Sequence, residues 1–305
     1  VIMKSDGMPT YNFAVVIDDA LMQISHVIRG EDHLSNTPKQ IQIYQALGFP
    51  VPKFAHIPMI LGPDRALLSK RHGATSVMQF KENGYLSPAM VNYLALLGWS
   101  YDDSQTIFPI PELVEKFSLD KVSKNPAVFD IQKLDWMNGV YIRELSLDDL
   151  FTEVKPFWQK AGFIPEEVSS ELKDYCLRIL KELQPRMKLL SESVEAARYF
   201  FTDDFAYKPE AVAKVFSKPQ TEEILRYAAD AVAGAPELDE EHLKPVFQAG
   251  LEKFGVKMGD LMQPLRVAVT GTNVSPGLYE VLALLGRDRV LKRIDRTLNM
   301  LKERS

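Results

Sequence analysis

The sequence has a single cysteine, Cys176, among its 305 residues. One cysteine cannot form an internal disulfide or supply a cysteine-rich zinc site, so we expect no zinc in this chain. The apolar spacing around Cys176 is helical, which predicts a small buried side chain rather than a reactive thiol. No apolar run approaches the roughly 20 residues that a membrane span needs, and no signal peptide is visible. These absences predict a protein of the reducing cytoplasm with no membrane partner.

The chain also lacks a basic excess. It has 36 lysines and arginines against 41 acidic residues, which gives a formal net charge of −5 at pH 7. A generic nucleic-acid coat is strongly basic, so this class of protein is excluded. A specific RNA binder is not excluded, because local patches of charge steer phosphates. A basic segment near the C-terminus leaves two interpretations open, a solvated helix face or an RNA contact: Arg287, Arg289, Lys292, Arg293 and Arg296.

The first sixty or so residues have the pattern of an α/β fold. Tyr11–Ile17 is rich in β-branched and aromatic residues and predicts a buried strand, and Ser25–Arg29 predicts a second one. Thr37, followed by proline, predicts the start of a helix that Gly48 ends. Phe54–Leu61 predicts a third strand. Strand, helix and strand at this spacing form a parallel crossover, whose ligands bind at the carboxyl ends of the strands.

The rest of the chain has a helical pattern. Helices are predicted to start at Ser87, Pro111 and Asp130, and the last of these is expected to end near Gly139. Beyond position 146 the apolar residues keep a helical period, and no strand is predicted. The remaining residues are therefore expected to form an all-helical module of at least two packed layers.

A basic loop follows the third predicted strand. The run Leu67–Arg71 has the sequence LLSKR and lies between a Gly-Pro-Asp turn and a His-Gly pair. Lysine supplies a point charge and arginine a planar fork of donors, so Ser69, Lys70 and Arg71 are candidate ligands for a polyphosphate. Taken alone, a loop of this kind is more often a solvated surface turn.

Three segments have the order and spacing of a known family. They are Ser5–Ala14 (SDGMPTYNFA), His26–His33 (HVIRGEDH) and Arg71–Ser76 (RHGATS). With these segments, nearly the whole chain resembles the bacterial glutamyl-tRNA synthetases, which are class I aminoacyl-tRNA synthetases with a KMSKS-type loop. The resemblance implies an α/β fold followed by an all-α part.

Two features depart from the family pattern. Leu67 stands where the loop has its first lysine, which removes one potential phosphate contact. The His-x-Gly-His signature, which holds ATP phosphates in class I enzymes, is absent, because none of the five histidines has that context. We therefore expect a fragment that lacks the N-terminal half of a synthetase and is inactive by itself.

The resemblance also implies domain boundaries and partners. Residues 1–62 would form the C-terminal half of a Rossmann catalytic domain, and residues 63–143 the KMSKS-type loop and a stem-contact domain. Residues 144–206 and 207–305 would form two helical anticodon-binding subdomains. The implied activity is that of a glutamate–tRNA ligase, with L-glutamate, ATP with Mg²⁺, and tRNA(Glu) as partners. The implied protein is a cytoplasmic monomer.

Candidate residues for amino-acid binding lie near the predicted strand ends. Activating an amino acid with ATP joins two anions, so the site needs positive charge. Arg29 could hold a substrate carboxylate with its planar fork, or it could form an ion pair with Glu31 or Asp32. The resemblance implies that Arg29 reads the glutamate side chain and that Tyr11 helps to hold the amino acid. From the residues alone, Tyr11 would be a core aromatic.

Candidate residues for ATP binding follow the third predicted strand. The resemblance implies that the backbone of Met59 and Ile60 binds adenine, while their side chains pack in the core. It implies that Ser69 and Arg71 lie in the ATP-binding loop. It also implies that Lys70 is the catalytic lysine, which stabilises charge on the α-phosphoryl group as the adenylate forms.

Candidate residues for anticodon binding lie in the helical part. The resemblance implies that Arg186 reads the third anticodon base and that glutamine there would tolerate tRNA(Gln). It implies that Arg266, Ser275, Pro276 and Leu278 bear on the other anticodon bases. Single-stranded RNA recognition needs a surface that can take splayed bases, and the loop that follows Arg266 is suited to this. An ordinary loop between helices is the alternative.

Other functions compete with this interpretation. A short paralogue that glutamylates a modified base in tRNA(Asp) lacks the helical anticodon module, and glutaminyl-tRNA synthetase has a β-barrel anticodon domain. The helical pattern of this chain argues against both. The alternative from a different class is a non-catalytic tRNA-binding module made of the C-terminal part of the synthetase.

Overall fold

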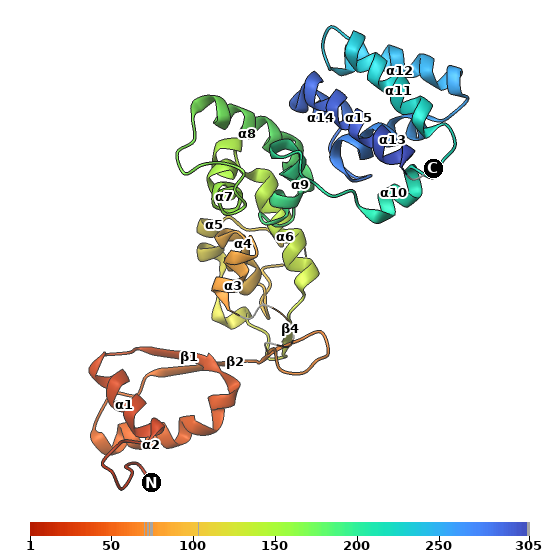
Figure 1. The fold of residues 1–305 in the computed structure, drawn as a ribbon. Helices are drawn as coiled ribbons and strands as arrows, with labels where there is room; N and C mark the ends of the chain where they lie inside the picture. Colours follow the sequence, from red (N-terminus) through yellow and green to blue (C-terminus); the bar gives the residue numbers. More distant parts are fainter. Residues whose placement is uncertain (70, 72, 74–75, 103, 304–305) are drawn as a thin grey trace. The chain divides into compact units, whose positions relative to one another are not determined.

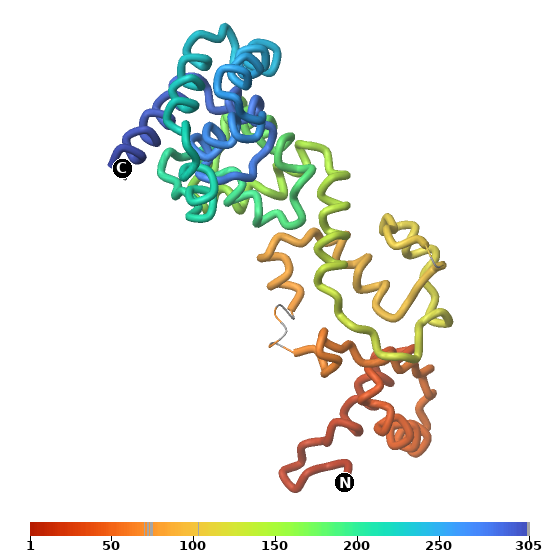
Figure 2. The backbone as a smooth tube through the Cα atoms, turned by 90° about the vertical axis from the view of Figure 1, so that its right-hand side faces the viewer, coloured from red at the N-terminus to blue at the C-terminus, as the bar shows by residue number. Residues whose placement is uncertain are grey.

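The computed structural model describes residues 1–69, 71, 73, 76–102 and 104–303. The chain divides into two compact units. The N-terminal unit comprises Val1–Lys81 and Leu86–Met137, and the C-terminal unit comprises Glu82–Tyr85 and Asn138–Ser305. Figure 1 labels most of the helices and strands of both units, and Figure 2 follows the backbone from red at the N-terminus to blue at the C-terminus.

The N-terminal unit contains a small parallel β-α-β crossover. β1 (His26–Gly30) and β2 (Lys53–Ile57) pair in parallel along all 5 residues of each strand. The 3-10 helix η1 (Glu31–Asn36) and helix α2 (Thr37–Leu47) connect the two strands. Gly48 ends α2 in the left-handed region, with φ at +69°, which glycine adopts without steric cost. The predicted second strand and the predicted helix that follows it are confirmed.

The first predicted strand, Tyr11–Ile17, is wrong, because this segment belongs to helix α1 (Tyr11–Leu21). A continuous apolar run fits a buried strand and a buried helix equally well, and length decides between them. The segment runs on through Asp18 to 11 residues, which is long for a strand. Only Val16 is buried in it, and α1 packs against α2.

The third predicted strand, Phe54–Leu61, is correct only in part, because it is split in two. After β2 ends, β3 (Ile60–Leu61) pairs in parallel with β4 (Ala127–Val128) in a separate two-stranded sheet. Pro58 lies between the two strands, and proline has no N–H group for a sheet hydrogen bond. The chain therefore changes partner at this position, and β3 leads directly into the basic loop.

Helices follow β3 in the chain. They are α3 (Val77–Glu82), α4 (Ser87–Ala95), α5 (Ile110–Lys116) and the short 3-10 helix η3 (Leu119–Lys121). Trp99, Phe108 and Leu113 form a buried cluster beside α4 and α5. The predicted helix starts near Ser87 and Pro111 are confirmed.

Helix α6 (Ile131–Glu144) carries the chain from the N-terminal unit into the C-terminal one. Asp130 caps it as predicted, since its Oδ1 accepts hydrogen bonds from the N–H groups of residues 132 and 133. The predicted end near Gly139 is wrong, because the helix continues to Glu144. Gly139 serves close packing instead, as a Cβ there would lie 3.2 Å from the carbonyl oxygen of Met187.

The C-terminal unit is helical throughout the residues that the structure describes, as predicted. α7 packs on α8 and α9, while α11 packs on α12, α13 and α15. The bounds are α7 (Leu147–Lys160), α8 (Ser170–Leu183), η4 (Gln184–Arg186), α9 (Glu192–Phe201), α10 (Pro209–Val215), α11 (Thr221–Gly234), α12 (Glu240–Phe254), α13 (Met258–Thr270), α14 (Leu278–Leu285) and α15 (Arg287–Lys302).

Cys176 lies in the core of this unit, in α8, as predicted. Its side chain is fully buried, and burial raises the pKa of the thiol to about 11. The thiolate is the reactive form of cysteine, so this residue is a packing element. Of the helices that the structure describes, none is both long and apolar enough to cross a membrane.

Candidate functional site

Arg29 lies near the carboxyl end of β1 and is held by three polar side chains. Its Nη2 atom donates to the hydroxyl of Thr37 and to Oε1 of Gln40, both at 2.8 Å. Its Nε atom donates to Nε2 of His56 at 3.4 Å. Thr37 and Gln40 belong to the first turn of α2 and are buried. The third nitrogen, Nη1, makes no hydrogen bond to any residue that the structure describes, so two N–H donors remain for a ligand.

The expected alternative, an ion pair of Arg29 with Glu31 or Asp32, is wrong. Oε1 of Glu31 accepts from the backbone N–H of Met59 at 3.2 Å, and Asp32 lies 3.7 Å from Nε2 of His33. No carboxylate among the described residues forms a salt bridge with Arg29. The guanidinium is therefore oriented by neutral groups, and its charge is not compensated within this network.

His56 accepts a hydrogen bond from Arg29 because its imidazole ring is neutral. Burial lowers the pKa of His56, and the positive charge of Arg29 lowers it further. Because Arg29 can only donate, Nε2 of His56 is the acceptor, and the neutral ring carries its proton on Nδ1. A neutral imidazole can accept from a guanidinium, whereas a protonated one would repel it.

Tyr11 lies at the start of α1, next to the same network. Gln40, which accepts from Arg29, donates through Nε2 to Oδ1 of Asn12 at 2.8 Å. Tyr11 precedes Asn12, and its ring centroid lies 5.5 Å from that of His33. The side chain of Tyr11 is half exposed, so the interpretation as a core aromatic is wrong. One polar chain thus links Arg29 to the start of α1.

The proposed adenine segment makes internal hydrogen bonds. The backbone N–H of Met59 donates to Glu31, and the carbonyl of Ile60 accepts from the N–H of Leu68 at 3.0 Å. The side chains of both residues are partly buried. A ligand that binds the N–H of Met59 must therefore displace the carboxylate of Glu31.

The basic loop is described only in part. Arg71 is well exposed and donates to Asp64 through Nη2 at 3.1 Å. Ser69 lies within the described residues, whereas Lys70, the predicted catalytic lysine, lies outside them. The carboxylate of Asp64 also accepts from the N–H of Ala66 at 2.9 Å, which closes a tight turn before the loop.

Arg186 and Arg266 meet in the C-terminal unit, although they lie far apart in the sequence. Nη1 of Arg186, in η4, donates to the carbonyl oxygen of Ser275 at 2.5 Å. Nη1 of Arg266, in α13, donates to the same oxygen at 3.4 Å, to the hydroxyl of Ser275, and to the carbonyl of Pro276 at 2.6 Å. Neither arginine forms an ion pair with a carboxylate of the described residues.

Arg186, Ser275 and Pro276 line a cavity of about 580 Å³, a size typical of small-ligand sites. Arg266 does not line this cavity, but it binds the two loop residues that do. Burial lowers the pKa of Arg266, and the nearby charge of Arg186 lowers it further. The predicted anticodon residue Leu278 is different, because it is buried at the start of α14 and does not line the cavity. The structure therefore brings four of the five predicted anticodon residues together.

The cavity contains acidic residues that sequence reasoning did not place there. Glu192, Glu195 and Glu210 are among its lining residues. Glu192 accepts hydrogen bonds from two backbone N–H groups of residues 188 and 189, and Glu195 pairs with Arg198 at 2.9 Å. Two of the three carboxylates thus have partners within the unit.

The basic residues of α15 were expected to form either a solvated helix face or an RNA contact, and neither interpretation fits all of them. Arg293 is 1% exposed and donates to the carbonyls of residues 199, 202 and 269 as well as to Asp203. Arg289 donates to the carbonyl of Phe200 at 2.8 Å. Both arginines stabilise the C-terminal end of α9, whose carbonyls lack helical partners. In contrast, Lys292 is mostly exposed.

Sequence reasoning missed several groups at both sites. The sequence indicates Thr37 only as a helix start, and it gives no connection of Gln40 or His56 to Arg29. Tyr199, which lines the cavity in the C-terminal unit, was not singled out. One sequence pattern could have predicted the contact of Arg29 with α2, namely polar residues in the first turn of a helix that follows a strand end.

Among the described residues, no group of three or more His, Cys, Asp or Glu side chains is placed to hold a metal ion.

The sequence matches known proteins along most of its length. Residues 1–136 match the family model described as tRNA synthetases class I (E and Q), catalytic domain, and residues 149–298 match the anticodon binding domain. The glutamate–tRNA ligase of Moorella thermoacetica is 46% identical over 303 residues, which are 99% of this chain and 62% of that protein. The ligase of Thermodesulfovibrio yellowstonii is 48% identical over 299 residues, which are 98% of this chain and 64% of that protein.

A solved structure agrees with these matches. The crystal structure of a glutamate tRNA ligase from Elizabethkingia meningosepticum in complex with its amino acid aligns with a TM-score of 0.81 at 30% identity. The alignment covers 99% of this chain and 62% of that one. This chain therefore spans less than two thirds of the length of each of these relatives. It belongs to the class I tRNA synthetases of the glutamate and glutamine group, with the catalytic-domain and anticodon-binding regions of that family.

Proposed function

We propose that this chain is part of a glutamate–tRNA ligase that activates L-glutamate with ATP and transfers it to tRNA(Glu). The observation that carries the proposal is the geometry of Arg29. Its guanidinium is fixed by Thr37, Gln40 and His56, while Nη1 keeps two free donors. Each of these two N–H groups can donate a charge-assisted hydrogen bond to a carboxylate oxygen. Because no carboxylate of the described residues pairs with Arg29, an anionic substrate would complete the site.

In the first step, an oxygen of the glutamate α-carboxylate attacks the α-phosphorus of ATP, and pyrophosphate leaves. Arg29 and Tyr11 hold the amino acid in this scheme. The backbone of Met59 and Ile60 binds adenine after Glu31 releases the N–H of Met59. ATP enters as its magnesium complex. In the second step, a hydroxyl of the terminal tRNA ribose attacks the carbonyl carbon of the adenylate, and AMP leaves.

The KMSKS-type loop supplies positive charge in the first step. Ser69 and Arg71 contact the phosphates in this scheme, and Arg71 exchanges its exposed ion pair with Asp64 for the ligand. Exposed ion pairs contribute little free energy, so this exchange has a small cost. Lys70, outside the described residues, stabilises the charge that develops on the α-phosphoryl group.

The cavity of the C-terminal unit takes anticodon bases. Arg186 reads the last base of the anticodon, which is C in tRNA(Glu) and G in tRNA(Gln). Unpaired cytosine presents the acceptors O2 and N3, which match the donors of a guanidinium. Guanine presents N1–H and N2–H donors on the same edge and would leave buried donors unpaired. We therefore propose that the enzyme charges tRNA(Glu) and discriminates against tRNA(Gln), with Arg266, Ser275, Pro276 and Leu278 serving the neighbouring bases.

We also propose the domain boundaries that the resemblance implies, which fall after residues 62, 143 and 206. We propose that the enzyme is a monomer and that it is cytoplasmic. A second candidate is a non-catalytic tRNA-binding module. It is favoured by one observation, the absence of a His-x-Gly-His context for any of the five histidines. For this reason we expect the 305 residues by themselves to bind tRNA without catalysing glutamate-dependent ATP–pyrophosphate exchange.

Two assays test the candidates, and the second separates them. The first measures binding of the 305-residue chain to a tRNA(Glu) transcript, which both candidates require. The second measures glutamate-dependent pyrophosphate exchange by a chimera that joins this chain to the part of the Moorella thermoacetica ligase outside the match. Exchange by the chimera, lost on Arg29→Ala, supports the ligase. A chimera that folds and binds tRNA but shows no exchange would leave only the binding module.

A further inference from the structure

Tyr199 carries a buried hydroxyl group without a partner. The residue lies in α9 and is 4% exposed, and its hydroxyl makes no hydrogen bond to any residue that the structure describes. Burial raises the pKa of Tyr199, so the hydroxyl keeps its proton. A buried polar group that lacks a partner destabilises the folded chain, and buried hydroxyls of this kind are rare. A bound ligand is one way to satisfy such a group.

The position of Tyr199 indicates where that ligand would bind. Tyr199 lines the 580 Å³ cavity together with Arg186, and the charges of Arg186 and of the neighbouring Arg266 act on its hydroxyl. Phe205 supplies an apolar wall of the same cavity and is itself 8% exposed. Aromatic walls and arginine planes are the surfaces on which unpaired RNA bases stack.

The backbone of Tyr199 is fixed, so its side chain cannot easily find another partner. The carbonyl oxygen of Tyr199 accepts from Nη2 of Arg293 at 2.8 Å and from Nη2 of Arg289 at 3.4 Å. Its ring also packs against Phe200, with the two centroids 4.4 Å apart. The same arginines that stabilise the end of α9 therefore fix the backbone from which this side chain extends.

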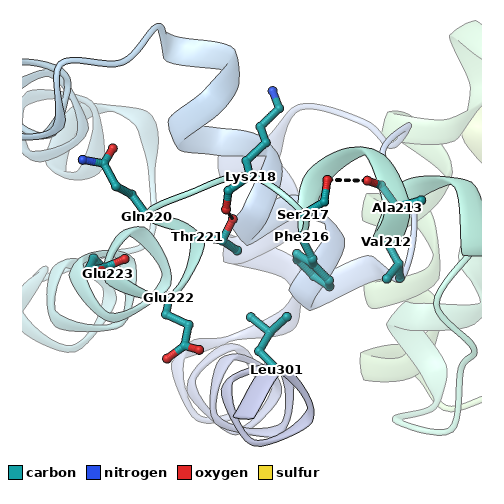
Figure 3. A pocket seen from close by; sticks show the side chains of 10 residues that line it. All are labelled: Val212, Ala213, Phe216, Ser217, Lys218, Gln220, Thr221, Glu222, Glu223 and Leu301. Carbon is teal, nitrogen blue, oxygen red and sulfur yellow. Dashed lines mark hydrogen bonds between the residues drawn. The ribbon is translucent and has the colours of Figure 1, made fainter. Parts of the chain in front are cut away.

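A second cavity in the same unit provides a contrast (Figure 3). It has a similar volume of about 610 Å³ and is lined by residues of α10, α11 and their connection, with Leu301 from α15. Its hydroxyls are satisfied, because Ser217 donates to the carbonyl of Ala213 at 2.6 Å and Thr221 donates to that of Lys218 at 2.8 Å. The ammonium group of Lys218 pairs with Asp260. Among the described residues that line it, this cavity therefore has neither a hydroxyl without a partner nor an arginine.

We propose that the hydroxyl of Tyr199 is a further specificity group of the Arg186 cavity, which donates a hydrogen bond to an acceptor atom of a bound, unpaired base. This inference rests on the proposed function, since the base is one of the anticodon. Arg186 can only donate, so a second donor in the cavity makes it selective for an acceptor-rich edge. Cytosine, with O2 and N3, offers such an edge, whereas guanine places donors there.

The test compares two Tyr→Phe variants of the full 305-residue chain. The probe is an RNA hairpin that carries the anticodon stem and loop of tRNA(Glu), and the measurements are its Kd and the Tm of the free protein. Tyr199→Phe should weaken hairpin binding about tenfold, because one buried hydrogen bond is lost. The same change removes an unsatisfied hydroxyl from the free protein, so its Tm should stay the same or rise by about 2–4 °C.

Tyr227→Phe is the matched control. The hydroxyl of Tyr227 donates to the carbonyl of Val246 at 2.6 Å and does not line the Arg186 cavity. Its removal should lower the Tm and leave the Kd for the hairpin unchanged. Tyr199→Phe is therefore expected to weaken binding without lowering the Tm, and Tyr227→Phe to lower the Tm without weakening binding.

Three outcomes would overturn the inference, and they differ in whether the proposed anticodon binding fails as well. If the wild-type chain does not bind the hairpin, the anticodon part of the proposed function also fails. If the wild type binds and Tyr199→Phe binds equally well, only the role of Tyr199 fails. If Tyr199→Phe lowers both the affinity and the Tm, the hydroxyl serves the fold rather than recognition.

Discussion

Arg186 donates a hydrogen bond of 2.5 Å to the carbonyl oxygen of Ser275, which lies 89 positions further along the chain. This contact ties η4 to the loop between α13 and α14. Arg266 binds the same loop residue, so both guanidinium groups are fixed in the free protein. A side chain that is already ordered loses less conformational entropy when it binds a ligand. The cavity is therefore preorganised for recognition.

Arg29→Ala should raise the KM for glutamate in the chimera by roughly tenfold to a hundredfold. The reason is that a charge-assisted hydrogen bond is worth about 1.5–3 kcal/mol. Arg29→Lys should also raise it, because the single nitrogen of lysine cannot bind Thr37 and Gln40 and still keep two N–H donors for the substrate. The measurement is pyrophosphate exchange at varied glutamate concentration.

Lys39→Ala provides the control for Arg29. Lys39 lies on the exposed side of α2, in the same turn as Gln40, and its removal also takes away one positive charge. The KM for glutamate should not change in this variant. If Arg29→Ala left the KM unchanged, or if Lys39→Ala raised it equally, the assignment of Arg29 to the substrate carboxylate would be wrong.

Asp203→Asn should destabilise the chain at neutral pH by about 2 kcal/mol. Nε and Nη2 of Arg293 both donate to Oδ1 of Asp203, at 3.0 and 2.6 Å. Removing one partner of a buried ion pair costs about 3–5 kcal/mol. The expected cost is smaller here, because Asp203 is 37% exposed and Arg293 keeps its carbonyl acceptors.

The effect of Asp203 should also depend on pH. The hydrogen bonds from Arg293 lower the pKa of Asp203 below its ordinary value. The stability that this carboxylate contributes is therefore present above the ordinary pKa and is lost as the pH falls through the lowered one. In urea unfolding between pH 7 and pH 2, the difference between wild type and Asp203→Asn should shrink on acidification. Asp204 is an exposed neighbour, and Asp204→Asn should have the stability of the wild type at every pH. If the difference in unfolding free energy between the wild type and Asp203→Asn stayed constant with pH, the account would be contradicted.

Gly84→Ala should destabilise the C-terminal unit much more than Gly255→Ala. Both glycines have positive φ, at +92° and +62°, so both substitutions carry a backbone cost of about 1–2 kcal/mol. A Cβ at position 84 would also lie 2.5 Å from the backbone nitrogen of Ser191, whereas a Cβ at position 255 meets nothing within 4 Å. We expect at least about 3 kcal/mol for Gly84→Ala. Equal urea midpoints for the two variants would show that the close approach at Gly84 is absent in solution.

The sequence predicted helices well where a start signal coincided with helical periodicity. Asp130 and Thr37 are examples, and both helices begin where the sequence indicated. It failed for α1, because a continuous apolar run does not distinguish a buried strand from a buried helix. It also failed at Gly139, because glycine marks either a helix end or a close approach of two backbones. Only the packing against Met187 decides between these two roles.

The candidate sites could be predicted as sets of residues but not as networks. Motif resemblance pointed to Arg29 and Arg186. The partners of Arg29 come from a neighbouring helix and a neighbouring strand, and the partner of Arg186 is a backbone carbonyl. The sequence cannot indicate which backbone carbonyl accepts a hydrogen bond, because every residue has a carbonyl group. The unsatisfied hydroxyl of Tyr199 is visible only once burial is known.

The central claim is that Arg186 selects the tRNA by its last anticodon base. Its most direct test is the Kd of the 305-residue chain for tRNA(Glu) and tRNA(Gln) transcripts, for the wild type and for Arg186→Gln. Arg178→Gln, an exposed arginine of α8 that does not line the Arg186 cavity, is the control. The account predicts that the wild type and the control prefer tRNA(Glu), and that Arg186→Gln reduces this preference by about tenfold or more, because a glutamine amide both donates and accepts. Equal affinity of the wild type for the two tRNAs would contradict it.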